Sequence, residues 1–314
     1  MSRGDSLYHP NRRLRRMLGP LFGAACFLAT LTGVFVLVIF LASILYAALG
    51  GTVRPIWDSF GQTIRDFVSL MAKSIQNRQS SDPAIAGFRV GLVGTLWLLG
   101  LVAAIGIPVG IGAGLFLEEY APPGRLKRIV QTNISNLAGV PSIVYGILGL
   151  ALFVRAFGVR GFAMGPSLLA GALTLGLLIL PTIVITTQEA LRAVPSSLRQ
   201  AALALGATRW QVISGHVLPA ALPGIMTGAI LGLSRVIGET APLLMVGAAG
   251  SILRLPKGPL DRYTALPVEI YNYAKEPDRQ FQVITAGGIL ILMLLLLTMN
   301  ATAILIRNRF RRGR

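Results

Sequence analysis

The stretch LRQAALALGATRWQVISGHVLP, residues 198–219, interrupts a chain that otherwise consists largely of long apolar runs. It mixes small, polar and apolar residues around a central glycine, Gly206. Glycine is the usual residue at the left-handed position that ends a helix. The stretch therefore predicts two short helices outside the membrane, joined at Gly206.

Capping signals support both helices. Ser197 and Gln200 have the spacing of a capping box, and Thr208 and Gln211 repeat that spacing. Pro219 suits the first turn of the apolar helix that follows. We therefore expect a compact helix–glycine–helix unit between two membrane spans.

The composition predicts a membrane protein. The chain has 314 residues, of which 54% are hydrophobic and 13% charged, whereas a soluble domain carries about 25% charged residues. A membrane-spanning helix needs about 20 apolar residues. We therefore expect an all-α, polytopic membrane protein with six transmembrane helices. The apolar runs that predict these helices are 19–49, 90–117, 133–157, 167–187, 220–250 and 282–306.

The runs divide the chain into segments. These are a basic tail 1–18, a first transmembrane helix 19–49, an external segment 50–89, a core of five transmembrane helices 90–306 with a connecting loop 188–219, and a basic tail 307–314. The first run is too long for a cleavable signal, whose apolar region has about 7–15 residues, so we expect a retained anchor. The external segment carries apolar residues at helical spacing, which predict an amphipathic helix. They are Ile64, Phe67, Val68, Met71 and Ile75.

The net charge of +17 predicts the orientation in the membrane. The arginines flank the apolar runs, which favours membrane orientation over a nucleic-acid partner. If the N-terminus is cytoplasmic, 16 of the 29 Lys and Arg residues lie in cytoplasmic segments and 12 outside. We therefore expect both termini in the cytoplasm. One cysteine and two histidines predict no intramolecular disulfide and no metal site.

The helix–glycine–helix unit resembles the EAA loop of ABC-importer permeases, so we call residues 188–219 the coupling loop. The positions that keep the family's spacing are Gln200-Ala201-Ala202, Gly206 and Leu218-Pro219. Two positions depart, because Gln200 replaces the acid and His216 replaces an isoleucine. The resemblance implies that the loop docks into a cleft on a separate ATPase and transmits its movement to the spans. Trp210 would be an anchor of the kind enriched at interfaces.

The chain contains no ATP-binding motif of its own. No G-x-x-x-x-G-K-[ST] sequence surrounds any of its four lysines. We therefore expect no cofactor in this chain, with ATP and Mg used by the partner ATPase. The chain is then not itself an enzyme.

Arg235 and Glu239 are the charged residues of the apolar run 220–250, and Arg235 falls at its midpoint. Charges at a span centre cost about 2.5–3.5 kcal/mol each and often mark a substrate pathway. The alternative is a static ion pair. The guanidinium fork matches an oxyanion, and phosphate retains a proton for the carboxylate, whereas sulfate has none. A pair that faces a cavity therefore favours phosphate.

A second resemblance points to the same cargo. Residues 235–242, R-x-x-G-E-T-A-P, resemble a segment of the PstA permeases of phosphate-specific transport systems, and residues 264–268 and 270–272 resemble their outer loop. Residues 139–146 resemble a stretch shared by the permeases of these systems. This implies a type I ABC-importer permease fold in a bacterial inner membrane, with Arg235, Glu239 and Thr240 on the substrate path. The implied partners are a PstC-type permease, an ATPase dimer, an external phosphate-binding protein and membrane lipid.

Three other functions stay open. The first is a permease for another oxyanion, such as sulfate or molybdate. The second is an ATP-independent channel or carrier. The third, a membrane enzyme, lacks support because the sequence shows no nucleophile–base set, metal cluster or paired carboxylates near a span end.

Overall fold

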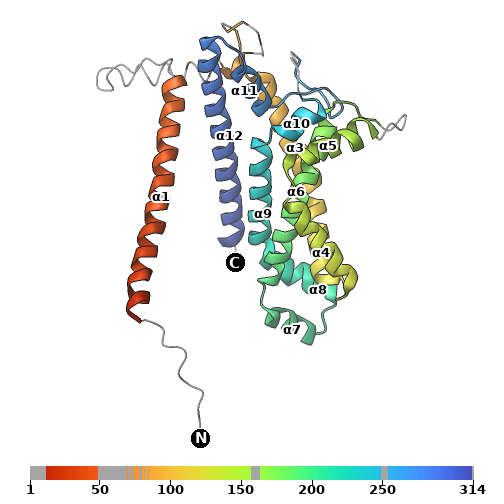
Figure 1. Ribbon diagram of the computed structural model, residues 1–314. Coiled ribbons are helices and arrows are strands. Elements are labelled where there is room, and N and C mark those ends of the chain that lie inside the picture. Colours follow the sequence, from red (N-terminus) through yellow and green to blue (C-terminus); the bar gives the residue numbers. More distant parts are fainter. Residues whose placement is uncertain are drawn as a thin grey trace.

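The computed structural model of the chain is all-helical (Figure 1). It describes residues 12–48, 69, 72, 74–77, 80, 82–83, 85–156, 163–248 and 254–312, with the backbone alone at 12–21 and 310–312. Five helices of the described chain are long and apolar enough to cross a membrane. They are α1 (Arg12–Ala48), α3 (Arg89–Leu115), α6 (Leu168–Arg192), α9 (Leu218–Gly238) and α12 (Arg279–Arg312).

Shorter helices connect these five. They are α4 (Arg125–Ala138), α5 (Ser142–Gly149), α7 (Ser196–Ala204), α8 (Arg209–Val212), α10 (Ala241–Val246) and α11 (Leu266–Ala274). π-Helical turns continue α3, α5 and α8, at Phe116–Tyr120, Leu150–Val154 and Ile213–Val217. The all-helical, multi-span architecture predicted from composition is confirmed, with long helices at 19–49, 90–117, 167–187 and 282–306.

The third predicted span is not one straight helix. Between α4 and α5 the chain bends by 105°, so residues 133–157 form parts of two helices. Pro141 lacks a backbone N–H and disfavours helical geometry at Val140, which ends α4 close to this point. No residue of α4 is buried within this chain. The described part of the chain therefore holds five candidate spans, or six if the bent pair counts as one.

The fifth predicted span, 220–250, is also interrupted. α9 ends at Gly238, Glu239 is extended, and α10 starts after Thr240 with Pro242 in its first turn. Proline suits the start of a helix but not its interior, so α9 and α10 are separate helices. At its other end α9 is continuous with α8 through the π-helical turn Ile213–Val217.

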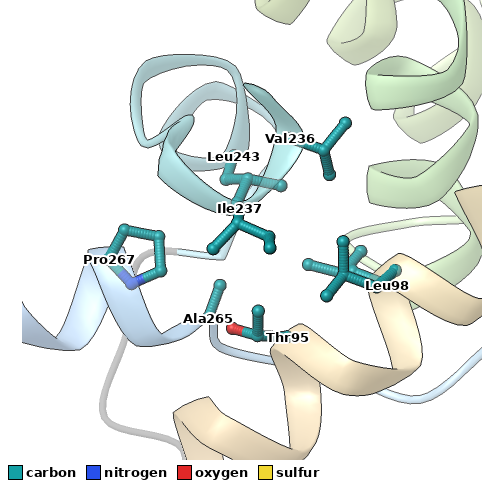
Figure 2. A pocket seen from close by; sticks show the side chains of 8 residues that line it. Thr95, Leu98, Val236, Ile237, Leu243, Ala265 and Pro267 are labelled. Carbon is teal, nitrogen blue, oxygen red and sulfur yellow. The ribbon is translucent and has the colours of Figure 1, made fainter. Parts of the chain in front are cut away.

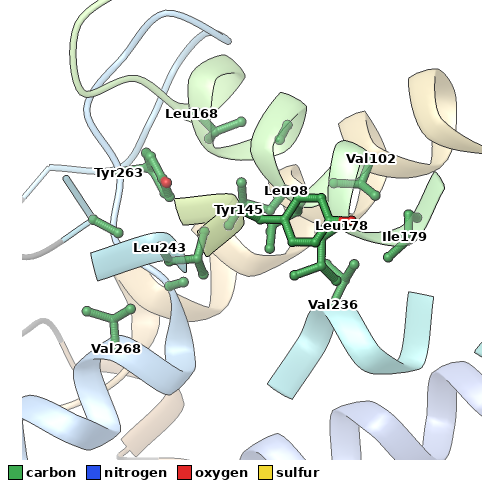
Figure 3. Packing of buried hydrophobic residues seen from close by; sticks show 14 of the residues in the cluster. Leu98, Val102, Tyr145, Leu168, Leu178, Ile179, Val236, Leu243, Tyr263 and Val268 are labelled. Atoms are coloured by element: carbon green, nitrogen blue, oxygen red, sulfur yellow. The ribbon is translucent and has the colours of Figure 1, made fainter. Parts of the chain in front are cut away.

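The helix α6 is at the centre of the structure and packs against α3, α5 and α9 (Figure 1). Leu98 and Val102 of α3 meet Leu178 and Ile179 of α6, and Val236 of α9 completes this cluster (Figure 3). All five side chains are buried. In a membrane, close van der Waals packing of such side chains holds the inner helices together.

Glycines let α3 and α6 approach closely. A Cβ at Gly110 would lie 2.6 Å from Ile183 Cγ2, and one at Gly114 would lie 2.7 Å from Thr187 Cβ. Small residues allow such close backbone approach between helices in a membrane. The glycine face of α3 therefore fixes its distance from α6.

The first helix stands apart from this cluster. Among its described side chains, Ile44 and Ala48 pack against Ala286 of α12, while most of the others are exposed. An apolar helix with this exposure is suited to lipid or a partner chain. Most of the predicted amphipathic helix at 64–75 falls outside the described residues, and of its apolar positions Ile75 is described and exposed.

The loop before α11 closes the end of the structure at which α6 begins. The backbone N–H groups of Leu168 and Leu169, in the first turn of α6, donate to the carbonyls of Asp261 and Pro259 at 2.9 and 2.7 Å. The N–H of Leu266 donates to Thr95 Oγ1 at 2.9 Å. These bonds tie the loop to both α6 and α3.

Glu269 of α11 is fully buried next to Gly91 of α3, and neither carboxylate oxygen has a hydrogen-bond partner of good geometry in the described structure. α11 is not among the candidate spans. Burial disfavours the charged form and raises the pKa of Glu269 to about 8, an effect that the backbone N–H of Gly91 offsets in part. The nearby Tyr273 hydroxyl is itself held by Ser80 N–H and the Gly87 carbonyl.

We predict that Gly110→Ala destabilises the protein by about 1–3 kcal/mol, because the methyl group collides with Ile183. Gly112→Ala on the same helix has open space around it, so it should be neutral or slightly stabilising. The unfolding midpoints of both variants in mild detergent test this. Equal effects of the two substitutions would contradict the packing argument.

We predict that Glu269→Gln weakens the pH dependence of stability. The raised pKa means that the folded state binds more protons than the unfolded chain between about pH 4.5 and pH 8. The stability contributed by the neutral carboxyl is complete below that window and is lost as pH rises through about 8. The glutamine variant should therefore lose less thermal stability than wild type between about pH 6 and pH 9.

The control for this prediction is Glu276→Gln, which changes an exposed acid just after α11. Its pH profile should match that of the wild type. An unchanged profile for Glu269→Gln would show that Glu269 is ionised throughout.

Candidate functional site

The coupling loop has the predicted helix–glycine–helix form. Gly206 has φ +82°, the left-handed conformation expected where the first helix ends. Thr208 and Gln211 form a capping box, with Thr208 N–H donating to Gln211 Oε1 at 2.8 Å and Gln211 N–H to Thr208 Oγ1 at 3.4 Å. The capping box predicted at Ser197 is wrong, because α7 already starts at Ser196 and no side chain caps it.

Most of the predicted coupling residues lie on the surface of the loop. Gln200, Ala201, Gly206 and Trp210 are exposed, whereas Ala202 is only 7% exposed. Ala202 packs in an apolar cluster formed by α6, α7, the segment after α8, and α9. It therefore fixes α7 to the spans and is not on the surface that another protein would contact.

Two exposed leucines, which the sequence did not indicate, also belong to this surface. Leu205 is 90% exposed, Leu203 is 52% exposed and Trp210 is 58% exposed. No helical spacing marks the two leucines in the sequence, because Leu205 follows the last residue of α7 and is only three positions from buried Ala202. We name Leu203, Leu205 and Trp210 the apolar surface of the coupling loop.

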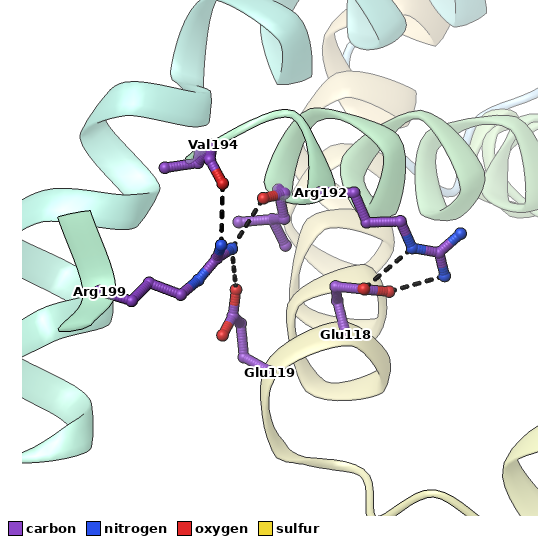
Figure 4. Close-up of polar contacts among 6 residues, drawn as sticks. Glu118, Glu119, Arg192, Val194 and Arg199 are labelled. Carbon is purple, nitrogen blue, oxygen red and sulfur yellow. Dashed lines mark hydrogen bonds and ion pairs between the residues drawn. The ribbon is translucent and has the colours of Figure 1, made fainter. Parts of the chain in front are cut away.

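Two ion pairs hold the base of the loop, and neither was predicted (Figure 4). Arg192, at the end of α6, forms a bidentate pair with Glu118, through Nε to Oε1 at 2.9 Å and Nη2 to Oε2 at 2.8 Å. Arg199 of α7 contacts Glu119 Oε1 at 2.8 Å. Both glutamates belong to the π-helical turn that ends α3.

Arg235 and Glu239 lie beside the break between α9 and α10. Arg235 is in the last turn of α9, so its predicted position at the centre of a continuous span is wrong. Its Nε contacts Glu239 Oε1 at 3.2 Å, and the side chains are 44% and 16% exposed. The structure describes no hydrogen bond from the two terminal nitrogens of Arg235 within this chain. The two terminal nitrogens of the Arg235 guanidinium therefore have no partner among the described residues.

The neighbouring segments bring the two predicted sequence motifs together. α5 packs on α10, with Gly146 against the Cα of Pro242 and the Met245 side chain. Tyr145 lies within electrostatic reach of Arg235 and donates a hydrogen bond to the Leu137 carbonyl at 2.8 Å. Thr240 precedes α10 and is half-buried, and its side chain makes no cap bond.

A small cavity behind the break is not suited to an anion. Its volume is about 10 Å³, close to the least that one water molecule needs. Figure 2 shows apolar walls made by Leu98, Val236, Ile237 and Leu243, with the hydroxyl of Thr95 at one side. This cavity is therefore too small and too apolar to hold an oxyanion.

The comparisons with known proteins identify the family. Residues 106–312 match the sequence model described as binding-protein-dependent transport system inner membrane component. The chain belongs to this family. It is thus the membrane permease component of an ABC importer and is not the catalytic subunit.

Individual permeases of this family agree with the assignment. The chain is 38% identical over 218 residues to the phosphate transport system permease protein PstA 1 of Mycobacterium tuberculosis (strain CDC 1551 / Oshkosh), covering 69% of each chain. It is 35% identical over 243 residues to the probable ABC transporter permease protein YqgI of Bacillus subtilis (strain 168), covering 73% of this chain and 80% of that protein. The predicted resemblance to the PstA permeases is confirmed.

Solved structures of ABC importers share the fold. A bacterial alginate ABC transporter aligns with a TM-score of 0.63 at 17% identity, over 93% of this chain and 96% of that one. The MetNI methionine transporter aligns with a TM-score of 0.57 at 21% identity, over 74% and 99%. The predicted type I importer permease fold is confirmed.

We predict opposite outcomes for glutamate at two adjacent positions of this permease. Ala202→Glu places a carboxylate in an apolar cluster and should destabilise the loop by roughly 2–7 kcal/mol, the cost of an unpaired buried polar group. Ala201→Glu adds a carboxylate at an exposed position and should leave the loop folded. Limited proteolysis of the coupling loop measures both. Equal protease resistance would contradict the observed burial of Ala202.

Proposed function

We propose that this permease is the PstA-type subunit of an ATP-driven importer of inorganic phosphate. It would form the translocation path with a PstC-type permease and receive phosphate from an external phosphate-binding protein. A separate ATPase dimer, using ATP and Mg, would drive it. The observation that carries the proposal is the Arg235–Glu239 pair at a helix break. Its arginine uses Nε to bind Glu239 and leaves both terminal nitrogens available to an anion.

The chemistry of the pair favours phosphate. The free terminal nitrogens of Arg235 can donate two parallel hydrogen bonds to an oxyanion. Glu239 then stands close to the same anion, where a carboxylate accepts a hydrogen bond from the protonated oxygen of phosphate but repels sulfate, which has no proton to donate. Thr240 adds a hydroxyl next to Glu239. The similarity to PstA permeases supports the same cargo, whereas the solved alginate and methionine transporters support only the fold.

The coupling loop supplies the connection to the ATPase. Gln200, Ala201 and Gly206 are exposed, and Trp210 is part of the apolar surface of the loop. An exposed, rigid aromatic side chain of this kind suits insertion into a groove on a partner protein. The ATPase dimer would close on ATP, move this loop and open the spans towards the cytoplasm.

We propose a bacterial inner-membrane location with both termini in the cytoplasm. The start of α1, the end of α12 and the coupling helices α7 and α8 lie towards the same side of the molecule (Figure 1). The Lys and Arg excess of the segments on that side favours the cytoplasm. Impermeant labelling of Cys introduced at Ser80 and Ser196 tests this topology, since only Ser80 should react from outside.

We predict that Arg235→Lys lowers phosphate uptake at least ten-fold while the complex still assembles, because lysine keeps the charge but not the planar fork. Glu239→Gln should reduce the preference for phosphate over sulfate, since a neutral amide no longer repels a dianion. The assay is uptake of both anions by proteoliposomes that contain the complete four-component complex. Glu276→Gln, an exposed acid away from the pair, is the control.

The wild-type complex distinguishes the other functions. Equal uptake of phosphate and sulfate would indicate a general oxyanion permease. Uptake without ATP would indicate a channel or carrier. Normal phosphate selectivity in an active Glu239→Gln complex would contradict the role of Glu239 as the acceptor of a hydrogen bond from phosphate.

A further inference from the structure

Arg199 joins the coupling helix α7 to two membrane spans at once. Its Nη2 contacts Glu119 Oε1 at 2.8 Å, in the turn that ends α3. The same guanidinium donates to the carbonyls of Val194 and Leu191 at 2.9 and 2.8 Å, at the end of α6. The side chain of Arg199 is 25% exposed and that of Glu119 is 12% exposed.

These bonds are directional, unlike the other contact that holds α7. The last carbonyls of a helix lack partners within that helix, and a cation there also complements the helix dipole. Arg199 supplies both and adds a charge-assisted bond to Glu119. Ala202 packs against the spans too, through apolar contacts that have no preferred direction. Arg199 therefore provides directional bonds from α7 to both α3 and the end of α6.

The neighbouring pair provides a comparison within the same molecule. Arg192 and Glu118 form a bidentate pair of similar length, between the end of α6 and the same π-helical turn. Neither residue belongs to α7. The Arg192–Glu118 pair joins α6 to the turn that ends α3, whereas Arg199 joins the coupling helix α7 to that turn and to the end of α6 (Figure 4).

We propose that the Arg199–Glu119 pair transmits movement of the coupling helix to α3 and α6. Arg199 and Glu119 are then positioning residues that determine how much phosphate moves for each ATP hydrolysed. This inference rests on the proposed function, because it requires an ATPase that moves α7. Without the pair, the ATPase still closes and hydrolyses ATP, but α7 tilts on its apolar contact and the spans follow less.

The first test measures the ratio of phosphate imported to ATP hydrolysed, in proteoliposomes with the complete complex and the external binding protein. Arg199→Gln and Glu119→Gln should each lower this ratio at least five-fold while ATPase activity stays within about two-fold of wild type. Arg192→Gln and Glu118→Gln are the matched controls and should keep the ratio within about two-fold. Arg199→Lys keeps the charge but cannot reach three acceptors, so its ratio should lie between the two groups.

An unchanged ratio in Arg199→Gln and Glu119→Gln would overturn the inference. So would an equal loss of transport and ATPase activity in all four glutamine variants, since that result indicates only structural support. Should the glutamine variants not assemble, Arg199→Lys and Glu119→Asp carry the same comparison of ratios.

The second test does not depend on the cargo. Spin labels at Ser197, in the first turn of α7, and at exposed Pro122, just after the turn that ends α3, report the distance between these elements in a Cys26→Ser background. In the wild type this distance should stay constant when ATP binds, and in Arg199→Gln it should change. A constant distance in both would overturn the inference, even if phosphate proves not to be the cargo.

Discussion

Inside a lipid bilayer, every backbone N–H and C=O group must find its partner within the protein. This constraint makes the chain all-helical and makes each helix break significant. The breaks at 139–141 and at 239–240 free backbone groups near the place where α5 packs on α10 and where both helices share an apolar cluster with Val236 of α9. The Arg235–Glu239 pair stands at the second break. Irregular backbone at membrane depth is tolerated where it is buried in protein or lines a water-filled path, which agrees with a role for this pair in transport.

The packing around α6 gives the breaks a rigid support. Glycines on α3 allow the α6 backbone to come close, and the loop before α11 fastens the far ends of both helices by hydrogen bonds. The coupling loop is attached at the opposite end of the same two helices, through Arg199 and Ala202. One pair of helices thus connects the side that would meet the ATPase with the region that would hold the anion.

Residues that are close in the sequence and of the same type have different roles in this structure. Ala201 and Ala202 are adjacent and chemically identical, yet one is exposed and the other is packed against the spans. Arg192 and Arg199 each bind a glutamate of the same turn, yet only one of the arginines belongs to the coupling helix. Such distinctions depend on which side of a helix faces the core, and they separate residues that hold the loop from residues that can contact a partner.

The sequence by itself determined the membrane class, most of the spans and the form of the coupling loop. These follow from local properties, namely the length of apolar runs, the conformational freedom of Gly206 and the capping box at Thr208 and Gln211. It also carried the motif that places Arg235 four residues before Glu239. The tertiary structure alone decided the 105° bend before α5, the end of α9 at Gly238, and the bonds of Arg199 to Glu119 and the end of α6. Hydropathy is averaged over a window, so it does not detect a helix break of two or three residues. Contacts between residues 80 positions apart form only when the helices pack.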